Sequence, residues 1–130
     1  MPEGIAVLDD LYARWRAPID PTAIAALFAV DGVWHNMMNP PLTGRAQIEA
    51  AIAGMSRSVE DVEFTTVASA AAGNVALVER VDWITWSDGT RVGLPVTGVF
   101  ELDDDGLIAA WRDYYDAGWL DEQTQLLRSA

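Results

Sequence analysis

Three charged side chains interrupt two apolar strand patterns in this sequence. Residues 75–86 alternate with a period of two, and Arg80 and Asp82 fall on a face that otherwise carries apolar side chains. Asp113 interrupts the apolar face of residues 107–116 in the same way. Burying a charge is costly unless it is paired and hydrogen-bonded. We therefore expect one guanidinium and two carboxylates to meet in a single cavity.

Such a group has definite acid–base consequences. One arginine can offset one carboxylate fully, which leaves the second acid in a low dielectric beside a like charge. The pKa of that acid should rise, so that near neutral pH one carboxyl group is protonated and the other is ionised. A protonated carboxyl beside an ionised one is a general acid beside a general base. A purely structural ion pair is the alternative, and the pattern alone favours neither.

Composition limits the other chemistries open to the chain. Its 130 residues are enough for a single domain, 1–130, with a core around a small cavity. There is no Cys and no Lys, and there is only one His, so thiolate, Schiff-base and His-rich metal chemistry are excluded. The net charge of −12 disfavours nucleic acid and an anionic membrane surface as partners.

The hydrophobic periodicity predicts helices first and strands afterwards. Apolar residues at helical spacing indicate helices over 5–16, 22–28 and a stretch after Gly44 that ends near Met55. Extended segments are expected at 33–37, 62–69, 75–86, 91–102 and 107–116, followed by a closing helix or tail at 119–127. This order is typical of an α+β fold with helices packed on one face of a curved, mainly antiparallel sheet.

Several local features can be tested against a structure. Asp20 should cap the second helix, with Pro21 at its first position. Residues 87–90, Ser-Asp-Gly-Thr, are typical of a hairpin turn. Pro95 should lie at a sheet edge or a bulge, because it cannot donate to a ladder. Both faces of 75–86 are rich in apolar residues, so we expect both to be covered.

Motifs in the second half of the chain resemble the limonene-1,2-epoxide hydrolase family, within the SnoaL-like and NTF2-like superfamily. They are ERVD at 79–82, GLPV at 93–96, GVFE at 98–101 and WRDYYD at 111–116, with WHN at 34–36 and a Pro-Leu pair at 41–42 upstream. Their order and spacing are more specific than the Arg-x-Asp motif alone. The resemblance implies an NTF2-like cone, in which helices and a curved mixed sheet enclose a pocket.

The resemblance also implies a reaction and a role for each motif residue. It implies one-step hydrolysis of an epoxide to a vicinal diol, with no cofactor, no metal and no covalent intermediate. Asp113 would deprotonate water, Asp82 would protonate the epoxide oxygen, and Arg80 would bridge the two. Asn36 would hold the water together with residue 34, which is typically Tyr in the family. Here it is Trp34, whose indole N–H can only donate.

The pocket and its substrate follow from the same residues. Ile84, Trp111 and Tyr115 share strand faces with the proposed acid and base, and we expect them to line the substrate site together with Met55. The substrate would be a small or medium apolar epoxide. The resemblance implies a homodimer formed through the sheet. The cytoplasm is the expected location, because the N-terminus lacks the basic start and apolar run of a signal peptide.

Two other functions remain open from the sequence. A SnoaL-like cyclase or a ketosteroid-isomerase-like enzyme would use Asp113 as a base on a carbon acid, although such chemistry has less need of an acid held by Arg80. A non-catalytic NTF2-like binding or dimerisation module would keep the three charges as a structural ion network.

Overall fold

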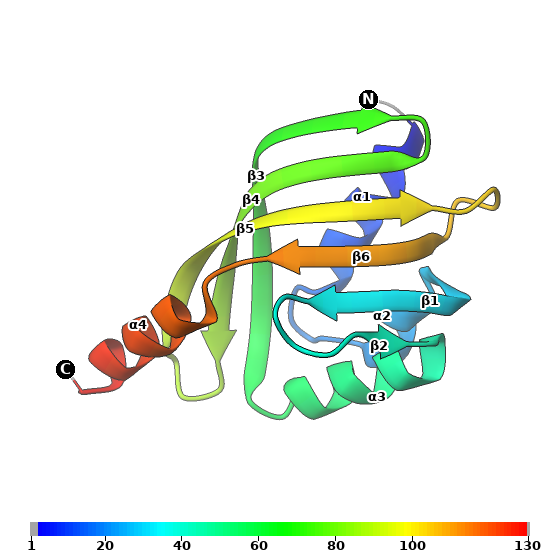
Figure 1. Cartoon of the computed structure of the whole chain (residues 1–130). Coiled ribbons are helices and arrows are strands. Elements are labelled where there is room, and N and C mark those ends of the chain that lie inside the picture. Colours follow the sequence, from blue (N-terminus) through cyan, green and yellow to red (C-terminus); the bar gives the residue numbers. More distant parts are fainter. Residues whose placement is uncertain (1–2, 130) are drawn as a thin grey trace.

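A single mixed sheet organises the computed structural model, which describes residues 3–129. The strands among these residues are β1 (Phe28–Asn36), β2 (Leu42–Thr43), β3 (Val59–Ala72), β4 (Val75–Trp86), β5 (Arg91–Leu102) and β6 (Ile108–Tyr114), in the spatial order β2-β1-β6-β5-β4-β3. The helices are α1 (Glu3–Arg14), α2 (Pro21–Ala25), α3 (Arg45–Met55) and α4 (Ala117–Ser129). Figure 1 shows this arrangement.

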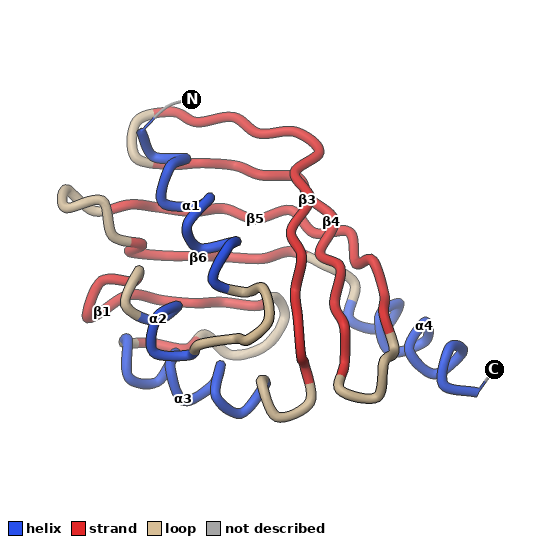
Figure 2. Tube along the Cα trace, turned by 180° about the vertical axis from the view of Figure 1, so that it is seen from behind, coloured by secondary structure: helices blue, strands red, loops and turns tan. Residues whose placement is uncertain are grey.

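The helices cover one side of the sheet. Figure 2 shows α1 crossing this side in front of β5 and β6, with α2 and α3 near the β1 end. β3 and β4 are long and bend, so that part of each curves toward α3 (Figure 2). α4 projects away from the sheet at the other side of the molecule (Figure 1). No helix within residues 3–129 is long and apolar enough to span a bilayer.

The strand pairing confirms the α+β fold expected from the sequence. β1 pairs with β6 in parallel, and every other pair in the sheet is antiparallel. The hairpin between β4 and β5 turns at 87–90, where Gly89 has a φ of +88°. Pro95 lies in the half of β5 that pairs only with β4, since the β5–β6 ladder begins at Thr97. Its position at an edge is therefore confirmed.

Several helix and strand boundaries differ from the predicted ones because of tertiary strand pairing. The second helix ends at Ala25, before the predicted end at residue 28, because Phe28 already pairs with Ile108 at the start of β1. β3 continues through a run of small residues to Ala72, beyond the predicted end at residue 69, because these residues pair with the start of β4. The predicted bounds of β4 and β5 are confirmed.

The expectation that both faces of β4 are covered is wrong for the single chain. The inner face carries Val78, Arg80 and Asp82, all buried. On the outer face Leu77 is 48% exposed and Glu79 is also exposed. The physical reason is that α1, α2 and α3 pack on the inner side of the sheet, and no helix among residues 3–129 covers the outer side at Leu77 and Glu79.

The core lies between the helices and the inner face of the sheet. Its largest fully buried apolar side chains come from three helices and several strands: Leu8, Leu11, Ile24, Phe28, Ile48, Ile52, Phe100, Ile108 and Trp111. Trp111 is at the centre of an aromatic stack, with ring centroids 5.2 Å from Phe100 and 5.3 Å from Trp34. This packing holds β6 rigidly next to β1 and β5.

We predict that Asp20 contributes to stability as a helix cap. Its carboxylate accepts a hydrogen bond from the Ala23 backbone N–H at 3.1 Å, and Pro21 starts the helix, as the sequence predicts. Asp20→Ala should lower the free energy of unfolding by about 1 kcal/mol, measured by urea denaturation. Asp20→Asn is the matched control and should stay close to wild type, because an amide oxygen caps as well. Equal losses in the two variants would contradict the capping role.

Candidate active site

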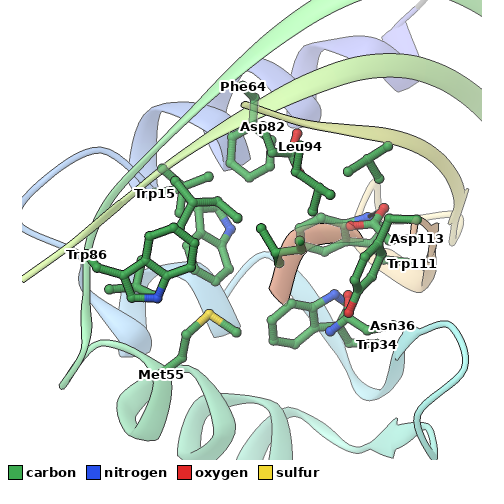
Figure 3. Close-up of a pocket in the computed structure, with 16 residues that line it drawn as sticks. Trp15, Trp34, Asn36, Met55, Phe64, Asp82, Trp86, Leu94, Trp111 and Asp113 are labelled. Atoms are coloured by element: carbon green, nitrogen blue, oxygen red, sulfur yellow. Dashed lines mark hydrogen bonds between the residues drawn. The ribbon is translucent and has the colours of Figure 1, made fainter. Parts of the chain in front are cut away.

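An apolar pocket opens between the bent strands and the helices. Its volume is about 240 Å³. Its wall is built by Trp15, Trp34, Asn36, Met55, Val59, Val62, Phe64, Asp82, Ile84, Trp86, Leu94, Val96, Trp111, Asp113, Tyr115 and Leu120. Figure 3 shows Asp82 and Asp113 among a ring of aromatic and aliphatic side chains. The charged groups of the pocket wall are these two carboxyls.

Arg80 joins the two carboxyl groups from behind the wall. Its Nε donates to Asp82 Oδ1 at 2.7 Å and its Nη2 to Asp82 Oδ2 at 3.0 Å, which is a bidentate fork. The same Nη2 donates to Asp113 Oδ2 at 2.5 Å. Asp82 and Arg80 are two residues apart on β4, and Asp113 comes from β6. The cavity with two acids and one guanidinium predicted from the sequence is therefore formed.

β5 separates the two strands that carry these charges, and Gly98 leaves the space between them. Gly98 pairs with Val78 on one side and with Asp113 on the other. A Cβ at this position would collide with Arg80 Nη1 and lie 2.8 Å from Asp113 Oδ1. The absence of a side chain at Gly98 is thus required for the guanidinium to reach across β5.

Burial shifts the pKa of all three charged groups. Burial raises the pKa of Asp82 to about 6, although Arg80 opposes this shift. Burial also raises the pKa of Asp113, while the charge of Arg80 and the hydrogen bonds from Arg80 and Trp111 favour its ionised form. Burial by itself would lower the pKa of Arg80, but the two carboxylates outweigh it and raise the pKa. Arg80 therefore stays charged.

Trp111 has a contact that the sequence reasoning missed. The sequence assigned it to the substrate pocket, and it does line the pocket. Its indole N–H also donates to Asp113 Oδ1 at 2.6 Å. A donor at this place favours the ionised form of Asp113. The signal was available, because the two residues are separated by two positions on one strand and share a face.

Asn36 and Trp34 lie beside Asp113 on the neighbouring parallel strand. Asn36 pairs with Asp113 and Trp34 with Trp111 in the β1–β6 register, and both residues line the pocket. Figure 3 shows Asn36, Trp34, Trp111 and Asp113 grouped on one side of the pocket. The Trp34 indole nitrogen is buried and has no acceptor among the described residues.

The remaining predicted pocket residues also line the cavity. Ile84, Met55 and Tyr115 all contribute to its wall. Sequence reasoning missed Trp15, at the end of the first helical segment, and Leu120 of α4. Neither has a local pattern that distinguishes a pocket residue from a core residue, and both reach the cavity only because distant elements fold together.

Comparison with proteins of known structure gives the same fold with several activities. A limonene-epoxide-hydrolase-like (LEH-like) epoxide hydrolase from M. tuberculosis is 27% identical, with a TM-score of 0.80, over 95% of this chain and 90% of that one. A hypothetical protein with a ketosteroid isomerase-like fold from Catenulispora acidiphila, in complex with trimethylamine, is 24% identical, with a TM-score of 0.80, over 92% of each chain. A Shewanella denitrificans protein classed as a SnoaL-like polyketide cyclase is 12% identical, with a TM-score of 0.84, over 96% of this chain and 98% of that one.

For the C. acidiphila and S. denitrificans proteins, which are 24% and 12% identical to this chain, the similarity shows the fold alone. Residues 8–111 of this chain match the SnoaL-like domain family, and this range contains Arg80, Asp82 and strands β1 to β5, whereas Asp113 on β6 lies two residues beyond it. The helix-then-sheet order, the mixed six-stranded sheet of the described residues and the enclosed pocket agree with that match. The chain belongs to the SnoaL-like domain family.

Proposed function

We propose that this protein is an epoxide hydrolase that adds water to an epoxide by general acid–base catalysis, without a cofactor. One observation carries the proposal: a single guanidinium bridges two buried carboxyl groups that face an apolar pocket, 2.7 Å from one acid and 2.5 Å from the other. This arrangement keeps a proton donor and a proton acceptor at a fixed separation. Opening an epoxide requires both at once.

The proposed reaction moves two protons. Asp113, whose ionised form is favoured by Trp111, takes a proton from a water molecule as the water oxygen attacks an epoxide carbon. Asp82, with a pKa raised by burial to about 6, gives its proton to the epoxide oxygen as the carbon–oxygen bond breaks. The product is a vicinal diol, and transfer of the proton from Asp113 back to Asp82 restores the starting state. Asn36, next to Asp113, and Trp34 would hold the water.

The pocket supports a small or medium apolar substrate. Its volume of about 240 Å³ is at the small end for a binding site. Its wall is mostly aromatic and aliphatic, with Met55, Ile84, Trp111 and Tyr115 close to the two acids. A neutral, compact epoxide with a hydrocarbon body fits such a wall.

Cyclase or isomerase chemistry is the other candidate, because relatives with this fold are classed as polyketide cyclases. That chemistry needs one carboxylate base on a carbon acid. It gives no role to a second acid that is held bidentately by Arg80 in the same pocket. The 27% identity to an LEH-like epoxide hydrolase also supports hydrolysis.

We predict that the wild-type protein forms diols from a panel of terpene, cycloalkene and styrene oxides. Asp113→Asn should reduce kcat by at least about 100-fold, because an amide cannot accept the water proton. Chiral gas chromatography of the diols measures turnover by the wild type and by Asp113→Asn. Asp104→Asn, in the exposed turn before β6, is the matched control and should behave as wild type. An Asp113→Asn variant that keeps more than about a tenth of the wild-type rate would rule out the base assignment.

We predict a pH profile set by Asp82. The acid must be protonated, and its pKa is raised to about 6. The value of kcat/KM should therefore fall about tenfold per pH unit above pH 6, as Asp82 loses its proton. Steady-state rates from pH 4 to 9 measure this, and a rate that increases from pH 6 to pH 8 would contradict Asp82 as the acid.

We predict that adding one methyl group at Gly98 disrupts the site. The new Cβ would displace Arg80 and crowd Asp113. Misplacement of catalytic groups by about 1 Å can cost on the order of 100-fold in rate, and we expect a loss of that size in Gly98→Ala. Gly54→Ala is the control, since nothing lies within 4 Å of a Cβ there, and it should keep full activity. Unchanged kcat in Gly98→Ala would show that Arg80 need not occupy its observed place.

A further inference from the structure

One end of the Arg80 guanidinium has no partner among the described residues. Nε and Nη2 are used by the two carboxyls, whereas Nη1 is buried and makes no hydrogen bond. The Arg80 side chain is 0% exposed. An unsatisfied buried donor costs about 1–3 kcal/mol, and more when the group is charged. The two N–H groups on Nη1 therefore require an acceptor in the same buried region.

The hydroxyl of Tyr12 is the matching unsatisfied group. It is also buried, and it makes no hydrogen bond of normal geometry with any residue among 3–129. Its ring, on α1, stacks on Phe64 at a centroid distance of 4.6 Å, and the Phe64 ring centroid lies 5.1 Å from Arg80 Cζ. Tyr12 is absent from the pocket wall. The Arg80 charge and a hydrogen bond from the Arg80 side chain both act on the pKa of Tyr12, which places its hydroxyl close to the guanidinium and outside the pocket wall.

The charges of Arg80, Asp82 and Asp113 shift the pKa of Tyr12. Burial raises the pKa of Tyr12 above its ordinary range, and the charges of Asp113 and Asp82 add to this rise, whereas the charge of Arg80 and a hydrogen bond from its side chain oppose it. Tyr12 therefore keeps its proton throughout the working range and remains a neutral hydroxyl. A neutral phenol oxygen can accept a hydrogen bond from a guanidinium N–H.

Of the buried side-chain polar atoms without a partner among residues 3–129, the Tyr12 hydroxyl is the one that can accept, because the others besides Nη1 are the indole N–H groups of Trp15 and Trp34. Gly98, whose Cβ would collide with Nη1, has no side chain. The rings of Phe64 and Trp111 flank the guanidinium at 5.1 Å and 5.6 Å from Cζ, and neither ring carries an acceptor oxygen. A hydrogen bond from Arg80 Nη1 to the Tyr12 hydroxyl would give each of these two buried groups a partner.

We propose that the Tyr12 hydroxyl accepts a hydrogen bond from Arg80 Nη1, directly or through one buried water, and thereby fixes the guanidinium that sets the positions of Asp82 and Asp113. Tyr12 is a positioning residue, because it acts through Arg80 and does not touch substrate. Its effect on turnover rests on the proposed epoxide hydrolase function. The hydrogen bond itself does not.

This contact explains how the bridge is held. Without it, Arg80 would be anchored only by the two carboxyls that it has to orient. A third anchor on α1 prevents the guanidinium from turning about its Cδ–Nε bond, and so fixes the acid and the base relative to each other. Helix α1, which contributes no catalytic group, becomes part of the active-site framework.

The kinetic test is Tyr12→Phe, which keeps the ring that stacks on Phe64 and removes only the hydroxyl. We expect kcat to fall about tenfold with KM changed by less than about twofold, because the pocket wall is unaltered. Tyr114→Phe removes an exposed hydroxyl outside the pocket and should match wild type. A rise in KM with unchanged kcat in Tyr12→Phe would overturn the positioning role.

The direct test is side-chain NMR of Arg80, which needs no substrate. In the wild type the Nη1 protons should exchange with water far more slowly than those of the exposed Arg57. In Tyr12→Phe their exchange should accelerate at least about tenfold, and in Tyr114→Phe it should not change. Wild-type Nη1 protons that exchange as fast as those of Arg57, or equal exchange in wild type and Tyr12→Phe, would overturn the proposal. Failure of the wild type to hydrolyse any epoxide would refute the proposed function alone, since the exchange measurement would still decide on the hydrogen bond.

Discussion

The structure depends on one buried guanidinium. Arg80 has no exposed side-chain surface, and a charge in that position is tolerated only because two carboxyls neutralise and hydrogen-bond it. The dependence is mutual, since neither Asp82 nor Asp113 could remain buried without it. The sheet is arranged around this constraint. β4 and β6 carry the charges, β5 lies between them, and Gly98 leaves the gap through which the guanidinium reaches.

The same constraint produces the acid–base asymmetry that catalysis requires. Two acids share one positive charge in an apolar pocket, so burial raises the pKa of both. Their remaining partners then separate them. Asp113 receives a second donor from Trp111, which favours its ionised form. Asp82 is held by Arg80 alone. In the proposed reaction the proton is retained on Asp82, and two chemically identical groups would thus acquire different roles from their surroundings.

The fold does not specify this chemistry. Proteins with this architecture include an LEH-like epoxide hydrolase and proteins classed as polyketide cyclases, at TM-scores from 0.80 to 0.84. What the fold supplies is a cone with an apolar pocket, and the side chains on β4 and β6 decide what occurs inside it. In this chain these are a bridged pair of acids, with Asn36 placed opposite Asp113 by the parallel pairing of β1.

The sequence alone determined the order of the helices and of every strand except β2, the bounds of β4 and β5, and the meeting of Arg80, Asp82 and Asp113. Hydrophobic periodicity encodes strand faces, and a charge on an apolar face must find a partner. Only the tertiary structure decided the start of β1 at Phe28, the exposure of the outer face of β4, and the contacts of Trp111, Trp15 and Tyr12 with the site. These features depend on which distant segments pack together. Local pattern carries no information about that, because a residue at a core position looks the same whether its neighbour is another core residue or a catalytic group.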